Sequence, residues 1–198
     1  MTPTRTVRGP LAILIVAALS ACPIPQTLPE YPASGTITPP RIQSDRVTPL
    51  NTIIEVDAAC PVAPVFTLSA RLVDENTYEK VEARWFVDYL PGRSTETPIP
   101  PIQIIEGPAD GLTIERKLDD FLFKPYGFDS AEFRAAGGLH VVELVVSNNF
   151  APEPDPPAPN PRPWRTPLKT ATQTFETQVY RWVFHYVPTG SGALCGYP

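Results

Sequence analysis

The sequence predicts an all-β domain of the sandwich class, in which two sheets pack face to face. Of the 198 residues, 27 are proline, and proline breaks helix interiors, which disfavours a helical bundle. Hydrophobic residues make up 42% of the chain and charged residues 19%, a composition typical of a globular protein. Short apolar or alternating runs recur between turn residues from residue 50 onward. About seven strands, one short helix and long proline-rich loops therefore favour a β-sandwich.

The first half of the domain supplies three expected strands, at residues 52–57, 65–73 and 81–89. Side chains of a strand alternate between its two faces. One face of the 65–73 strand is wholly apolar and consists of Phe66, Leu68, Ala70 and Leu72. We expect this face to enter the core.

The second half of the domain supplies three more expected strands, at residues 112–118, 139–146 and 172–187. A further apolar run, residues 102–105, lies in a segment that holds five prolines. Because proline cannot donate a hydrogen bond to a neighbouring strand, we expect this run to be an edge strand or a loop.

One short helix is expected just before the 139–146 strand. Asp129 is the candidate N-cap, because its side chain can accept hydrogen bonds from the first backbone amides of a helix. Glu132, three residues later, would complete a capping box. Gly137 would end the helix, since glycine readily adopts the left-handed conformation of a C-terminal cap.

The first 21 residues have the features of an export signal. Arg5 and Arg8 precede the apolar residues 11–19, a stretch too short to span a membrane as a helix. The apolar stretch ends in the four residues Leu19, Ser20, Ala21 and Cys22, which resemble the lipobox of bacterial lipoproteins. The resemblance implies cleavage before Cys22 and a diacylglyceryl group on its sulfur. The alternative is an ordinary secretory signal with a coincidental cysteine.

The resemblance also implies a location and a division of the chain. Several acyl chains on Cys22 would anchor the protein stably in a membrane of the bacterial cell envelope. In the sorting rule of that family, Pro23 in place of an aspartate favours the outer membrane. Residues 1–21 would be the signal, residues 22–49 the lipidated cysteine and a proline-rich tether, and residues 50–198 the β-sandwich domain.

Two cysteines remain after Cys22, namely Cys60 and Cys195. An exported chain meets an oxidising environment, so we expect these two to form a disulfide. The alternative is a pair of unpaired buried thiols. A zinc site is not expected, because the cysteines and histidines lack ligand spacing.

Residues 138–148 (GLHVVELVVSN) and residues 83–88 (ARWFVD) carry a second resemblance. The first segment is similar to the penultimate strand, and the second to the third strand, of immunoglobulin-like domains of the polycystic-kidney-disease type. The resemblance implies an immunoglobulin-like sandwich. It places His140 where the family has a corner tyrosine, so His140 would bond to the backbone. The chain departs from the family in its long insertions at residues 91–108 and 151–167.

The sequence does not predict an enzyme, a metal site or a cofactor. His140 and His185 both lie within expected strands, with no partner at the spacing of a metal site or a catalytic triad. No glycine-rich phosphate-binding loop is present. The formal net charge of −5 becomes −7 once the two arginines of the signal are removed, which argues against nucleic acid as a partner.

Residues 151–167 form the first candidate binding segment. They hold eight prolines, and an extended polyproline segment loses little entropy when it binds. Arg162, Trp164 and Arg165 are of residue types enriched at protein interfaces. Alternatively, Trp164 folds back on the domain and the prolines only stiffen a long connection.

The last strand is the second candidate. By the period of two, its aromatic side chains share one face, and they are Tyr180, Trp182, Phe184 and Tyr186. An exposed row of aromatic rings could stack on sugars or bind a partner. Alternatively, this face is part of the sandwich core.

Taken together, the sequence predicts a non-catalytic, membrane-anchored envelope lipoprotein. Its membrane contact would be the lipid on Cys22, and its domain would serve protein interaction or structure. The alternative function is a glycan- or peptidoglycan-binding module that uses the aromatic last strand.

Overall fold

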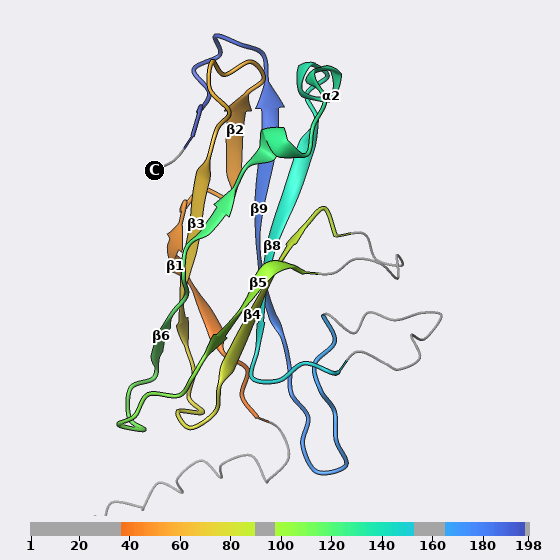
Figure 1. Ribbon diagram of the computed structural model, residues 1–198. Coiled ribbons are helices and arrows are strands. Elements are labelled where there is room, and N and C mark those ends of the chain that lie inside the picture. Colours follow the sequence, from red (N-terminus) through yellow and green to blue (C-terminus); the bar gives the residue numbers. More distant parts are fainter. Residues whose placement is uncertain (1–36, 90–97, 153–164, 197–198) are drawn as a thin grey trace, which may run out of the picture. The chain divides into compact units, whose positions relative to one another are not determined.

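The structure is a computed structural model that describes residues 37–89, 98–152 and 165–196. The predicted signal, Cys22, Arg162 and Trp164 lie outside these residues. Nine strands within the described part form two sheets (Figure 1). The all-β sandwich class is therefore confirmed, with more strands than expected.

The smaller sheet has four strands, and β3 lies at its centre. Its members are β1 (Arg41–Thr48), β3 (Phe66–Val73), β6 (Glu115–Lys117) and β7 (Phe121–Phe123). The larger sheet has five strands, in the order β2 (Ile53–Asp57), β9 (Gln178–Val187), β8 (Leu139–Ser147), β4 (Val81–Val87) and β5 (Ile99–Ile105). Helical structure in the described part is a 3₁₀ turn, η1 (Pro125–Gly127), and one short helix, α2 (Ala131–Ala135).

The strand order is that of an immunoglobulin-like sandwich. β1, β3 and β6 are neighbours in one sheet, and β9, β8, β4 and β5 are neighbours in the other. β2 runs parallel to β9, whereas β8 is antiparallel to both β9 and β4. The chain therefore changes sheets between β1 and β2, so that consecutive strands form edges of different sheets.

Aromatic side chains fill much of the space between the sheets. Trp85 of β4 is fully buried, with its ring 4.6 Å from that of Phe121 and 5.7 Å from that of Trp182. Phe184 packs against Phe66 at a ring distance of 5.0 Å. The apolar face predicted for the 65–73 strand is buried throughout.

The domain starts earlier than residue 50, where the sequence predicts its beginning. Residues 41–48, assigned to the tether, form β1 and pair with β3. Val47 is buried in the core and Ile42 packs against it. The prolines on either side, Pro40 and Pro49, obscure an eight-residue run that contains no proline.

The cap of the short helix also differs from the prediction. Ser130, and not Asp129, is the N-cap, and its side chain accepts a hydrogen bond from the backbone amide of Phe133 at 3.2 Å. The carboxylate of Asp129 turns to the interior, where it meets His140. Gly137 follows the helix with a φ of 74°, as predicted for the terminating residue.

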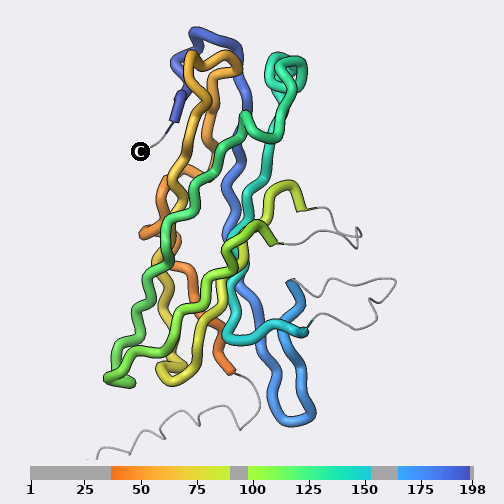
Figure 2. Tube along the Cα trace, viewed as in Figure 1, coloured from red at the N-terminus to blue at the C-terminus, as the bar shows by residue number. Residues whose placement is uncertain are grey.

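The disulfide between Cys60 and Cys195 is confirmed, with Cα atoms 5.6 Å apart. It holds the C-terminal segment against the free edge of β2. There the amide of Leu194 donates to the carbonyl of Glu55 at 3.0 Å, and the amide of Asp57 donates to the carbonyl of Leu194 at 3.1 Å. Figure 2 shows that the described chain begins at one end of the sandwich and that its C-terminal segment lies near the other.

Within the described ranges, no helix is both long and apolar enough to cross a membrane.

Candidate binding groove

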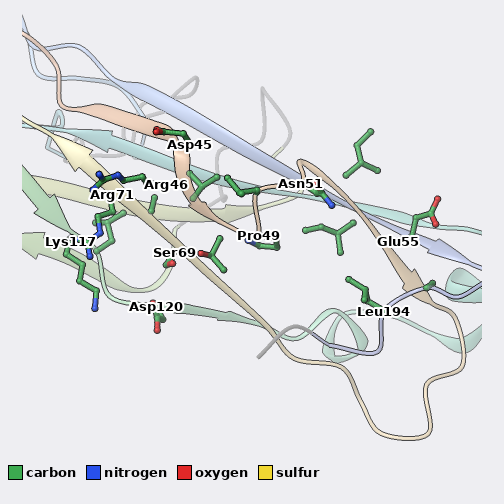
Figure 3. A pocket seen from close by; sticks show the side chains of 18 of the residues that line it. Asp45, Arg46, Pro49, Asn51, Glu55, Ser69, Arg71, Lys117, Asp120 and Leu194 are labelled. Carbon is green, nitrogen blue, oxygen red and sulfur yellow. The ribbon is translucent and has the colours of Figure 1, made fainter.

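A groove of about 1110 Å³ opens along the side of the sandwich where the chain changes sheets (Figure 3). One wall comes from β1 and β3 of the smaller sheet, and the other from β2 of the larger sheet. Residues 49–51, which connect β1 to β2, cross between the walls, and residues 192–194 lie on the β2 side.

The groove exists because β1, which runs antiparallel to β3, leaves the sheet before it reaches residues 66–68 at the start of β3. Thr48 is the last residue of β1 that pairs with β3, opposite Ser69. Pro49 follows and has no amide hydrogen, so the ladder cannot continue through it. From Ile53 onward the chain pairs with β9 in the other sheet. The two edge strands thus diverge.

The walls of the groove combine apolar and charged side chains. Leu50 and Leu194 are exposed, and Ile53 is 64% exposed. Charged groups of both signs also line it: Asp45, Arg46, Glu55, Arg71, Lys117 and Asp120. An extended polypeptide could bind here, because its apolar side chains, charged side chains and backbone groups would match the apolar residues, the charges and the strand edge of the groove.

The charged wall on the smaller sheet is held in place by Glu115. Its two carboxylate oxygens meet Arg71 at 2.5 Å and Arg46 at 3.4 Å, both at partly exposed positions. Exposed pairs of this kind contribute little to stability. Their consequence here is to fix where two guanidinium groups lie beside the groove.

The C-terminal segment limits the groove along β2. Its hydrogen bonds cover the free edge of β2 at residues 55–57, and Ile53 lies beyond the covered part. Asp57 supports this segment. Its carboxylate accepts hydrogen bonds from the amide of Ala59, and also from the Thr189 hydroxyl at 3.0 Å, and these bonds lower its pKa.

The aromatic row of the last strand is part of the core and not a binding surface. Trp182, Phe184 and Tyr186 are buried, and Tyr180 is partly buried against the same cluster. Large rings on one face of a central strand fill the space between two sheets, which is why the row is turned inward. A sugar-stacking platform on these residues is therefore wrong.

Of the predicted residues at the proline-rich loop, the structure describes Arg165. It folds back onto the outer face of the larger sheet, where its guanidinium lies 2.8 Å from the carboxylate of Glu143 and 4.3 Å from the ring centre of Tyr89. Glu143 also pairs with Arg181 at 2.5 Å. Arg165 thus anchors the end of the loop.

His140 does not bond to the backbone as predicted, but lies between two carboxylates. Its Nδ1 is 2.5 Å from Asp88 and its Nε2 is 2.7 Å from Asp129, which also accepts a hydrogen bond from the Tyr186 hydroxyl at 2.6 Å. Burial by itself lowers the pKa of His140, but the hydrogen bonds and charges of Asp88 and Asp129 outweigh it and raise the pKa above its ordinary value.

Because both ring nitrogens are engaged, His140 has no nitrogen left for a substrate or a metal. Its arrangement joins the start of the loop after β4 to the loop before α2, which is a structural role. Across the described ranges, no group of three or more histidine, cysteine, aspartate or glutamate residues could hold a metal ion.

Sequence reasoning missed the groove. One signal was available in the 52–57 strand, where Ile53 is out of phase with the inward-facing Ile54 and Val56. An apolar residue on the outer face of an edge strand is a candidate contact residue. Leu50 and Leu194 line the groove only because β1 and β2 are edge strands, and the sequence alone does not show which strands form edges.

No protein-family model matches the chain, and neither does any curated protein or solved structure.

Proposed function

We propose that this protein is a lipid-anchored, non-catalytic binding module of the bacterial cell envelope. A lipid on Cys22 holds it to a membrane, and the groove between β1 and β2 takes an extended segment of a partner protein. The partner lies along the edge of the larger sheet and contacts the apolar side chains of the groove.

The observation that carries the binding role is the groove itself. Two of its apolar side chains are exposed: Leu50, in the connection from β1 to β2, and Ile53, at the start of β2. Exposed apolar side chains at a concave site are more informative than scattered ones. The C-terminal segment covers β2 at residues 55–57, so the strand edge that stays open lies at Ile53. There the backbone can bond to an extended chain, as in strand addition.

The anchoring role is supported by the sequence around Cys22. A short apolar stretch behind two arginines, followed by Leu19, Ser20, Ala21 and Cys22, resembles a lipoprotein signal at every part. The disulfide between Cys60 and Cys195 is consistent with an exported protein.

The binding role is tested by photo-crosslinking in cells. A photoreactive amino acid replaces Ile53 on β2, and in a matched control it replaces Ile104 on β5, the edge strand at the other side of the same sheet. The two side chains are 64% and 54% exposed. We expect a discrete protein adduct from position 53 that is absent from position 104.

A second variant ties the adduct to the groove. Leu50→Asp places a carboxylate at the apolar part of the groove, and it should weaken the adduct from position 53 at least about tenfold, because burying an unpaired charge is unfavourable. No adduct at position 53, or equal adducts at both positions, contradicts the binding role.

A further inference from the structure

The two most exposed large apolar side chains in the described part of the chain belong to loops that meet at one end of the sandwich. Tyr78 is 88% exposed and Leu112 is 80% exposed. They belong to different loops, between β3 and β4 and between β5 and β6. The ring of Tyr78 covers Gly111, where an added Cβ would lie 2.7 Å from the ring, and Leu112 is the next residue along the chain. We call these two side chains the apolar tip.

The chain enters the domain at this same end. The side-chain Nδ2 of Asn76 donates to the carbonyl of Thr38 at 2.6 Å, and the backbone amide of Ile37 donates to the carbonyl of Thr174 at 3.3 Å. The loop that carries Tyr78 is thus bonded directly to the first described residues. Figure 1 shows the beginning of the described chain beside these loops, at the lower end.

The tip is held in a defined shape. Gly107 lies so close to the backbone of Thr77 that a Cβ would approach its carbonyl oxygen to 2.6 Å. The carboxylate of Asp110 accepts hydrogen bonds from the amides of Leu112 and Thr113 at 2.9 and 3.0 Å. These contacts fix the backbone of the loop that carries Leu112, whose side chain is exposed.

We propose that the apolar tip rests in the surface of the membrane that carries the anchor and so orients the domain, with the disulfide end pointing away. This inference rests on the proposed lipid at Cys22. The 16 residues from Cys22 to Ile37 can extend at most about 50 Å and as a coil span about 20 Å. A tip on such a short tether meets the bilayer at a high effective concentration, so two side chains suffice.

The charges around the tip select the kind of membrane surface. Glu79, Glu106 and Asp110 are exposed near it, with Lys80 as the neighbouring cation. Hydrogen bonds from the amide of Leu112, and from Thr113, lower the pKa of Asp110 to about 2, so its carboxylate stays ionised. These carboxylates repel anionic lipids. The tip therefore fits a zwitterionic headgroup region, where tyrosine and leucine insert by their apolar parts.

The test couples the mature chain to vesicles through Cys22, which is the one thiol outside the disulfide. The vesicles are phosphatidylcholine with brominated acyl chains and a small fraction of maleimide lipid. Leu112→Trp reports on the tip, and Val62→Trp, at a position 75% exposed beside the disulfide, is the matched control. Bromine in the acyl chains quenches tryptophan that enters the bilayer.

We expect at least twofold stronger quenching of the added fluorescence of Leu112→Trp than of Val62→Trp. The difference should fall when a third of the lipid is anionic, and Tyr78→Ser in the same chain should reduce it. Equal quenching at both positions, or none at either, overturns the inference. Because the coupling is chemical, this result does not depend on whether cells lipidate Cys22, which is measured separately by mass.

Discussion

His140 shows how a single side chain can tie two loops together. The imidazole lies between Asp88, which is partly exposed, and Asp129, which is buried. Asp88 has a φ of 52° and also accepts a hydrogen bond from the amide of Val141 at 2.7 Å. An otherwise unfavourable backbone conformation is thus held by the contacts of its own carboxylate.

Replacing His140 should destabilise the fold. His140→Asn leaves the Asp129 carboxylate buried with the Tyr186 hydroxyl as its partner, and we expect a loss of about 3 kcal/mol in the free energy of unfolding at pH 6. Urea denaturation measures this. The matched control is His185→Asn at the other histidine, which is only half-buried, and it should change stability by less than about 1 kcal/mol. Equal losses in both variants would contradict the role of His140.

Comparing wild type with His140→Asn at several pH values tests whether His140 carries a charge in the folded state. A pKa raised on folding means that the folded state binds the proton more tightly, so the stabilisation is complete below the unfolded pKa of about 6.5. It declines as the pH rises through the folded pKa. The difference in unfolding free energy between wild type and His140→Asn should therefore be smaller at pH 9 than at pH 6. A difference independent of pH would show that His140 acts as a neutral residue.

Residue-scale predictions from the sequence fail where a side chain has two options. Aspartate is a favourable N-cap residue, but the neighbouring Ser130 caps the helix instead. The carboxylate of Asp129 is hydrogen-bonded to the buried imidazole of His140. His140 was placed correctly within a strand. Its partners, Asp88 and Asp129, come from loops that only the tertiary structure brings together.

At the scale of elements, the C-terminal segment works as a short extra strand. Leu194 bridges to Val56 on the free side of β2, and the disulfide at Cys195 fixes it there. A free strand edge is a template for pairing with other chains, and covering it prevents unwanted association. The bond between Cys60 and Cys195 therefore both restrains the unfolded chain and keeps this edge covered.

Removing the disulfide should expose this edge. Replacing both cysteines, as Cys60→Ser with Cys195→Ser, should lower the free energy of unfolding by about 3 kcal/mol, since the bond links residues 135 apart in sequence. Hydrogen exchange at the amides of Asp57 and Leu194 should accelerate more than exchange at the β4–β8 pairing. Chemical reduction of the wild type is the control and should give the same result. Unchanged exchange at Asp57 and Leu194 would show that the segment stays paired without the bond.

Element prediction from sequence succeeds where the apolar pattern is strong. The expected strands at 65–73, 81–89 and 139–146 correspond to β3, β4 and β8. The 172–187 strand begins later, at Gln178, because Lys169 and Thr174 instead form their own bridge in a polar turn. β1 was missed because a mostly polar edge strand between two prolines has the composition of a linker.

At the scale of the whole molecule, the sandwich follows from the sequence but the groove does not. Alternating apolar faces and the lack of long helical patterns predict two packed sheets. Which strands lie at the edges is decided by pairing between distant segments, such as β2 with β9. The aromatic row of β9 illustrates the same limit, because its periodicity gives a shared face but not the direction in which that face points.

The positions of the proposed contacts fit one arrangement of the molecule. The chain enters the domain at the end that carries the apolar tip, while the covered edge of β2 and the disulfide lie toward the other end (Figure 1). With a lipid on Cys22, the groove along the side would face the space next to the membrane and stay open to a partner.

The proposed location and orientation of the domain depend on a lipid at Cys22, and the mass of the processed N-terminus tests that lipid most directly. The protein is purified from the membrane of cells that produce the full chain, and its N-terminal peptide is measured by mass spectrometry. We predict a peptide that begins at Cys22 and carries a diacylglyceryl group. A peptide that begins at an unmodified Cys22, or that retains Ser20 and Ala21, would contradict the account.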